Sequence, residues 1–209
     1  MAAGTLGDSG TLDGELVQDQ LRVRARPLLR NAPGYAVPVL VDTGEVTGSR
    51  QYTLAPEFAL VFGPFTVQAE WAGQFLTQAV ASNGLPQGTV FYHGGYIEAL
   101  YFLTGEHQEY VKQEGVFGRV VPRANYHLKK GDDCWALGAW QVGLRFSYLD
   151  LNDKAIQGGQ LYDWTVGLNW FLNPNMKVQF NYIVEHREAP QNVTDSWING
   201  FGIRGAYDF

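Results

Sequence analysis

Cysteine, basic charge and long apolar runs are all scarce in this sequence, and each scarcity excludes a class of protein. The single cysteine, Cys134, rules out an intramolecular disulfide, and no Cys-x-x-Cys pair is present for metal binding or dithiol chemistry. Basic residues number 15 against 21 acidic ones, which argues against nucleic acid, whose phosphates require clustered lysine and arginine. No apolar run reaches the roughly eighteen residues of a membrane-spanning helix, but spanning strands need only about ten alternating residues each.

Recognisable catalytic and metal-binding spacings are also missing. The histidines are scattered and form no His-Glu-x-x-His motif; they are His93, His107, His127 and His186. No Ser/His/Asp arrangement, paired-acid motif or phosphate-binding P-loop stands out. The sequence therefore predicts neither an enzyme nor a metal site nor a bound cofactor.

The N-terminal residues 1–16 lack the basic stretch followed by an apolar stretch that makes a secretory signal peptide. The chain is therefore expected either to stay inside the cell or to begin partway through a longer protein. We expect these residues to lie outside a strand-rich part that runs from 17 to 209. Aromatic residues make up 14% of the chain and glycines number 25, a composition that predicts a folded rather than a disordered chain.

Alternation of apolar with polar or small residues, at a period of two, dominates the sequence and indicates β-strands. Signals for helices are nearly absent. Most of the expected strands exceed the five or six residues that are usual in soluble proteins. They lie near 17–26, 52–62, 65–75, 90–104, 140–148, 164–172, 176–187 and 196–209, with tight turns at 63–64 and 173–175.

The two faces of these strands differ in a way that suits a membrane. One face of each is broadly apolar with aromatic residues near its ends, as in the aromatic girdles of transmembrane barrels, whereas the other mixes charge with Gly, Ala, Asn and Gln. Closing the sheet would leave no unpaired backbone groups in lipid. The predicted fold is all-β, an antiparallel transmembrane β-barrel of about eight strands. A soluble sandwich or a lipocalin-like cup is the alternative.

Connection lengths give the expected strands a direction. The short turns at 63–64 and 173–175 are expected on the periplasmic side, together with the end of the chain. Two connections are long: 27–50 on the outer side and 105–134 on the periplasmic side. Long connections are often functional, and inside a wide barrel they can fold inward and narrow the pore.

Several segments resemble one family of porins. The final stretch GFGIRGAYDF places Ile203, Tyr207 and Phe209 as in the assembly signal of bacterial outer-membrane barrels. Together with GPFTVQAEWAGQF (63–75), YIEALYFLTGE (96–106), WALGAWQVGLRFSYLDL (135–151) and GGQLYDWTVGLNWFLNPNMKVQFNYI (158–183), it resembles the C-terminal half of the phosphate-selective porin O and P family.

The resemblance implies a barrel of about sixteen strands in the bacterial outer membrane, assembled as a homotrimer. It also implies outer-membrane lipids and the barrel assembly machinery as partners, and inorganic anions such as phosphate as the transported solutes. This sequence supplies only about half of the strands. We therefore expect a fragment with open sheet edges, which would need the missing half to be covered.

Arginines are the candidate residues for an anion path. Arg22, Arg24 and Arg26 alternate in LRVRARP (21–27), so on one strand they would share a face at steps of about 7 Å. The resemblance implies an arginine ladder here, continued by Arg30. Arginine forks suit phosphate oxygens. The remaining candidates, Arg145 and Arg204, have the parity of the barrel interior.

The alternative is that these cations only pair with acids across the wall. Acids of the same interior parity are Glu57, Glu70, Glu98, Asp163, Glu185 and Asp208. The predicted function is a fragment of a passive outer-membrane porin that conducts anions such as phosphate. Three other functions stay open: a non-specific diffusion porin, a stand-alone eight-stranded outer-membrane barrel with a structural role, and a soluble β-sandwich binding module.

Overall fold

The computed structural model describes residues 19–28, 37–111, 113, 115–127, 136–189 and 193–208. These residues contain no helix of the length and apolarity needed to cross a membrane. The expected N-terminal segment 1–16 lies outside the described residues, as do Arg30, Cys134 and Phe209.

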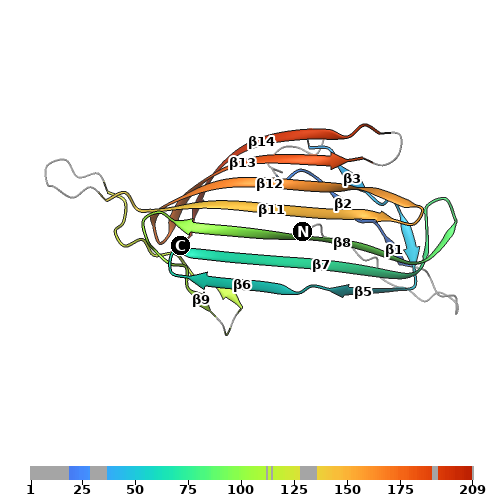
Figure 1. The fold of residues 1–209 in the computed structure, drawn as a ribbon, viewed down its shortest axis with the longest axis horizontal. Coiled ribbons are helices and arrows are strands. Elements are labelled where there is room, and N and C mark those ends of the chain that lie inside the picture. Colours follow the sequence, from blue (N-terminus) through green and yellow to red (C-terminus); the bar gives the residue numbers. More distant parts are fainter. Residues whose placement is uncertain are drawn as a thin grey trace.

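A single antiparallel sheet makes up most of the described chain (Figure 1). Three short strands follow one another along the same edge of β7 and act as one interrupted strand; they are β4 (Val46–Gly48), β5 (Arg50–Leu54) and β6 (Glu57–Phe62). The sheet continues through β7 (Phe65–Val80), β8 (Pro86–Phe102), β11 (Ala139–Asp153), β12 (Ile156–Asn173), β13 (Met176–Glu188) and β14 (Ser196–Tyr207). A short strand, β1 (Asp19–Leu21), pairs with β4.

The sheet curls without closing, so the described strands form a half-barrel. Neither β14 nor the β5–β6 stretch has a partner on its outer side among the described strands. The prediction of an all-β, antiparallel sheet that forms part of a larger barrel is confirmed, and the described strands do not form the alternative, a closed eight-stranded barrel. Pro56 interrupts the edge between β5 and β6, where a residue without an N–H is tolerated because no neighbouring strand needs that donor.

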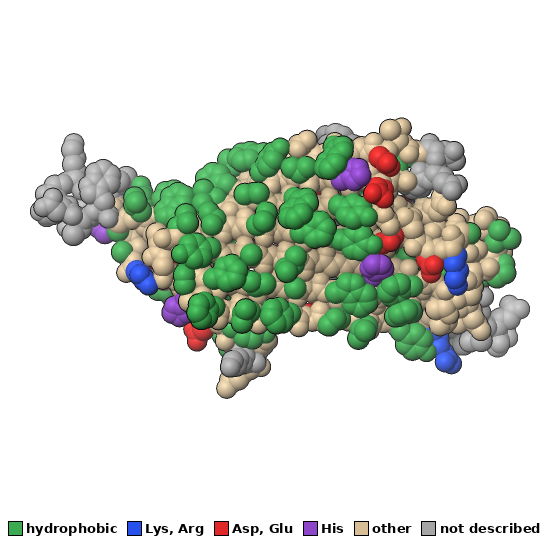
Figure 2. Space-filling model, in the orientation of Figure 1, with side chains coloured by type: hydrophobic (Ala, Val, Ile, Leu, Met, Phe, Trp, Pro, Cys, Tyr) green, Lys and Arg blue, Asp and Glu red, His purple; other side chains and the backbone are tan. Residues whose placement is uncertain are grey.

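Register places the two kinds of side chain on opposite faces. Across the sheet, one row of directly opposed residues on the convex face is apolar: Val67, Ala99, Leu144, Val166, Tyr182 and Phe201. The next row, on the concave face, contains Gln68, Glu98, Arg145 and Thr165. Figure 2 shows this face covered by hydrophobic side chains over its middle, with charged side chains toward the two ends, more of them at the right.

Aromatic residues bound this apolar face at two levels. Near the short turns, Trp140 and Trp170 stack with ring centroids 5.1 Å apart, and both indoles donate to the carbonyl of Leu137. Toward the other end, Tyr148 and Tyr162 lie 5.3 Å apart. The aromatic levels are eight positions apart on β11, about 26 Å at 3.3 Å per residue. Because the strands of a membrane-spanning barrel tilt by about 35–45°, this separation corresponds to roughly 20 Å across the membrane, a little less than the usual apolar band of about 25 Å.

The first expected strand, 17–26, is only partly a strand of the wall. Pairing with the wall stops at Leu21, and β2 (Arg24–Ala25) pairs instead with β3 (Val41–Asp42) in a separate two-stranded ribbon. The ribbon leaves the wall because its apolar side packs into a core on the concave face. That core joins Leu21, Val23, Ala25, Leu40, Val41 and Val46 to wall residues that include Leu76, Val90, Leu151 and Leu161.

The second long connection also contains structure. Within it, β9 (Tyr110–Val111) and β10 (Val116–Phe117) form a small hairpin. Val120 then packs with Phe102, Ala139 and Phe171, all of them buried. The connection is thereby attached to the end of the sheet where the short turns lie (Figure 1).

Candidate ion pathway on the concave face

Buried and exposed residues alternate as expected in the arginine-bearing segment 21–28. Beyond Leu21, however, the segment is not a strand of the wall but packs against its concave side. Leu21, Val23 and Ala25 are buried, whereas Arg22 and Arg24 are exposed and Arg26 is half-buried. Hydrogen bonds hold the segment in place: the Val23 N–H donates to Thr43 Oγ1. The side chains of Arg22 and Arg24 are therefore on the side of the segment opposite to its buried apolar residues.

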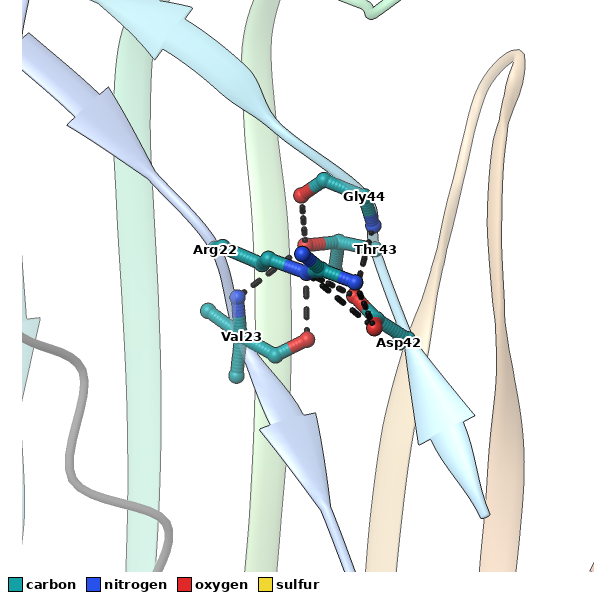
Figure 3. Close-up of polar contacts among 5 residues, drawn as sticks. All are labelled: Arg22, Val23, Asp42, Thr43 and Gly44. Atoms are coloured by element: carbon teal, nitrogen blue, oxygen red, sulfur yellow. Dashed lines mark hydrogen bonds and ion pairs between the residues drawn. The ribbon is translucent and has the colours of Figure 1, made fainter. Parts of the chain in front are cut away.

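Arg22 is ion-paired rather than free. Its guanidinium donates to both carboxylate oxygens of Asp42, at 2.6 Å for the closest contact (Figure 3). Hydrogen bonding and charge from Arg22 lower the pKa of the Asp42 carboxyl. Residues 22–28 and 37–45 are the two arms of what we call the inward segment, and the Arg22–Asp42 pair joins them. Asp42 Oδ1 also accepts a hydrogen bond from the Gly44 N–H on its own arm. Arg26 donates to the Val37 carbonyl and thus also links those arms.

The inward segment reaches the far side of the half-barrel. The Leu28 N–H donates to Glu185 Oε1 on β13 over 2.8 Å. Glu185 lies directly opposite Asp163 on β12, and both carboxylates are almost fully buried. The segment is therefore attached to the wall at a pair of acids.

A cavity of about 1050 Å³ lies on the concave face, between Leu28 and the short turns. Four cations and two acids line it: Arg119, Arg145, Lys177 and Arg204 against Glu98 and Asp208. Neutral polar groups such as Asn169, Gln179 and Asn181 fill the space between them. The cavity is therefore polar and carries an excess of positive charge.

Two of these cations are already engaged. Arg145 lies 3.7 Å from Glu98 and 3.7 Å from the centre of the Tyr96 ring, and its Nε donates to Ser147. Arg119 lies 2.9 Å from Asp208. These contacts fix the position of each guanidinium and neutralise much of its charge.

The other two cations lack an acidic partner. Among the described residues, no carboxylate oxygen lies within 4.0 Å of Lys177 or Arg204. Arg204 is opposite Gln179 on β13, and Lys177 is two positions along from Gln179 on the same face. Such diagonal neighbours lie about 7–8 Å apart. Lys177 also lies 5.8 Å from the centre of the Phe171 ring. Together they form an unneutralised positive patch on the cavity wall.

A row of acids marks the opposite limit of this positive region. Glu57, Glu70, Asp163 and Glu185 all have concave parity and lie at one level of the sheet, with Tyr96 and Ser147 between the two pairs. The inward segment meets the wall at this row, through Leu28 and Glu185. The concave face is therefore mixed in charge, with its positive patch confined to one end.

The structure brings together only part of the residue set predicted from sequence. Arg145 and Arg204 share the cavity, whereas Arg22, Arg24 and Arg26 lie on the inward segment and Arg30 lies outside the described residues. Ile203 and Tyr207 lie exposed on β14, and Phe209 is also outside the described residues. Arg119 was missed because its long connection has no periodicity. The sequence places Lys177 on the interior face by its parity. It does not show that Lys177 lacks an acidic partner, because that depends on which strands become neighbours.

Metal binding finds no support in the described ranges. There, no three His, Cys, Asp or Glu side chains come close enough to hold an ion together. The feature that could act on a solute is therefore electrostatic: it is the positive patch on the wall of a polar cavity.

A half-barrel with an apolar convex face, two aromatic levels and a charged concave face is the wall of a porin-like β-barrel. Comparison with known protein families identifies the family to which this chain belongs. The model of the family described as phosphate-selective porin O and P matches residues 2–209. The chain therefore belongs to the phosphate-selective porin O and P family, as its sequence predicted.

A curated relative extends this comparison. An uncharacterized protein of Caulobacter vibrioides is 32% identical over 148 residues, which are 68% of this chain and 28% of the relative. The chain thus spans less than a third of the length of the relative that it matches.

Proposed function

We propose that this chain forms part of the wall of an outer-membrane channel that conducts anions such as phosphate. Lys177 and Arg204 would attract the ion, and the arginines of the inward segment, Arg22, Arg24 and Arg26, would extend its path. The observation that supports this best is the absence of any carboxylate partner for Lys177 and Arg204 among the described residues.

The physical argument is one of partial neutralisation. A conducting site must attract an ion enough for entry and yet release it. Arg119 and Arg145, each held by an acid, would guide the ion without trapping it, whereas Lys177 and Arg204 supply net attraction. Lysine and arginine are both common phosphate ligands.

Family membership supports the remaining parts of the proposal. We infer a position in the bacterial outer membrane, a homotrimeric whole protein, and insertion by the barrel assembly machinery through the signal at Ile203, Tyr207 and Phe209. The exposed apolar side chains of the convex face fit contact with outer-membrane lipids.

The experiment is ion selectivity in a planar bilayer. The refolded chain, or the longer porin if the chain is part of one, is compared with K177Q/R204Q in a salt gradient. One charge about 7 Å from an ion is worth roughly RT in a water-like dielectric, so each substitution should lower the anion-to-cation permeability ratio about threefold. R50Q is the control, since Arg50 lies on the edge strand β5 and does not line the cavity.

A general diffusion porin is the second candidate, and the acidic row of the concave face favours it. In that case K177Q/R204Q and R50Q would show the same weak selectivity as the unmodified protein. Phosphate would also fail to reduce the chloride current. Either result contradicts the anion path.

A further inference from the structure

A row of amide side chains crosses the wall of the polar cavity. Gln141, Asn169 and Gln179 are directly opposed on β11, β12 and β13, and all three line the cavity. Asn169 Nδ2 donates to Gln141 Oε1 over 2.8 Å, and Gln179 Nε2 donates to Asn169 Oδ1 over 3.0 Å. Gln141 is only 2% exposed and anchors one end of the row. These hydrogen bonds hold the amides in place before any solute arrives.

A fourth amide extends this row along β13. Asn181 is two positions from Gln179 on the same face and also lines the cavity. The residue directly opposite it on β12 is Gly167, and a Cβ there would lie only 3.1 Å from Asn181 Oδ1. The lack of a side chain on Gly167 therefore lets the Asn181 side chain lie toward β12. We call these four amides, Gln141, Asn169, Gln179 and Asn181, the amide patch.

The amide patch keeps both donors and acceptors for a solute. Each side-chain amide has two N–H donors and a carbonyl oxygen with two acceptor sites. Among the described residues, neither Gln179 Oε1 nor Asn181 Oδ1 accepts a hydrogen bond. The oxygens of an ionised phosphate can only accept, so they offer nothing to these two carbonyl oxygens, whereas a hydroxyl group both donates and accepts. The patch is therefore better matched to hydroxyl groups than to phosphate oxygens.

The two cations without an acidic partner lie at one end of the amide patch. Arg204 is directly opposite Gln179 on the next strand, and Lys177 is two positions from Gln179 on β13. Because neighbouring strands are about 4.8 Å apart, Asn169 on β12 and Arg204 on β14 are separated by about 10 Å across the sheet. A solute must extend over two strand spacings to contact both. The cavity volume of about 1050 Å³ is at the upper end of the range of small-ligand sites.

We propose that the cavity binds hydroxylated organic anions such as sugar phosphates, with the anionic group at Lys177 and Arg204 and the hydroxyl groups on the amide patch. The inference rests on the proposed function, because it requires anions to pass along the concave face, and it adds the class of solute. An inorganic anion would use only the cationic end. A neutral sugar would use only the amides. A solute that carries both kinds of group uses the whole arrangement.

The test is block of the chloride current in a planar bilayer, with the refolded chain or, if the chain is part of one, the longer porin. Glucose 6-phosphate is compared with methyl phosphate, which carries the same charged group without the hydroxyls. We expect glucose 6-phosphate to halve the current at about tenfold lower concentration, the effect of roughly two neutral hydrogen bonds. Tripolyphosphate is the third probe, since it has more charge and length but no sugar hydroxyls.

Two variants test whether the amides are responsible. N181L removes an amide that makes no side-chain hydrogen bond among the described residues, and Q179L/N181L removes both carbonyl oxygens that accept none. N181L should weaken the glucose 6-phosphate block, and Q179L/N181L should reduce it to the level of methyl phosphate. The methyl phosphate block should stay unchanged in both. Q74L is the matched control, because Gln74 is a half-buried amide of concave parity that does not line the cavity.

The outcomes separate this inference from the proposed function. If none of the three probes reduces the chloride current, the proposed function fails. If methyl phosphate blocks as strongly as glucose 6-phosphate in the unmodified protein, a comparison that depends on the folding of no variant, the inference is overturned and the anion path stands. Equal glucose 6-phosphate block in Q179L/N181L and Q74L also overturns it. So does a tripolyphosphate block that weakens in Q179L/N181L as much as the glucose 6-phosphate block, since the patch would then bind phosphate oxygens.

Discussion

The cations of the concave face differ in whether an acidic side chain lies next to them. Arg22 has Asp42, Arg119 has Asp208 and Arg145 has Glu98, whereas Lys177 and Arg204 have no acid within 4.0 Å among the described residues. Sequence parity could place Arg145, Lys177 and Arg204 on one face, because a strand alternates strictly. It could not separate paired from unpaired cations, since pairing depends on which strands become neighbours.

The Arg22–Asp42 pair gives a prediction about pH. Because Arg22 lowers the Asp42 pKa, the pair stabilises the inward segment above the unfolded value of about 4, and this contribution is lost as the pH falls through the lower folded value. D42N should therefore lower the urea midpoint at pH 6 to 8, and its difference from the unmodified chain should shrink below about pH 4. The introduced amide keeps an oxygen acceptor for the Gly44 N–H, so the change isolates the charge.

D195N is a suitable control for that titration. Asp195 accepts from the Ala189 N–H but has no basic side chain within salt-bridge distance among the described residues. A D42N difference that stayed constant down to pH 3 would mean that the ion pair does not hold the segment.

Among the elements, the wall strands were far more predictable than the segments that fold inward. The strands β7, β8 and β11 to β14 combine a long apolar face with a polar or small one, and this period of two predicts an extended chain between an apolar and a polar environment. The described residues of the two inward connections, 22–28, 37–45, 105–111, 113 and 115–127, pack against other parts of the chain and have no uniform apolar and polar sides. Their contacts, such as Leu28 with Glu185 and Val120 with Phe171, join residues far apart in sequence and leave no periodic signal.

Val120 tests whether the second of these segments is a fixed part of the cavity. It is 6% exposed and packs in the cluster with Phe102, Ala139 and Phe171. V120A should lower the free energy of unfolding by about 2 kcal/mol, since two buried methyl groups are replaced by a void. We also expect noisier single-channel current, because Arg119 and Val120 line the cavity. V121A is the control, as Val121 is 63% exposed.

An unfolding midpoint unchanged by V120A would show that the cluster adds little to stability. A large loss of stability with unchanged current noise would show that the segment does not bound the conducting path.

At the scale of the whole molecule, the two aromatic levels set the thickness of membrane that the sheet fits. Their separation of about 26 Å along tilted strands corresponds to roughly 20 Å across the membrane. Refolding should therefore be more complete in vesicles of dicapric than of dioleoyl phosphatidylcholine, because a thick bilayer would bury polar residues beyond the aromatic levels. Heat-modifiable gel mobility measures the folded fraction, and equal yields in the two lipids would contradict the assigned apolar band.

The two edge strands of the open sheet have a fixed relative direction. The interrupted strand β4–β6 and the last strand β14 are separated by five antiparallel neighbours, so the two edges run the same way (Figure 1). Two copies of this sheet joined about the barrel axis would therefore meet in parallel at both seams. Antiparallel closure requires an odd number of additional spanning strands, and β1, which already pairs antiparallel with β4, marks where the first of them would lie. The strands that complete this barrel must therefore be odd in number, and the closed barrel has an even number of strands.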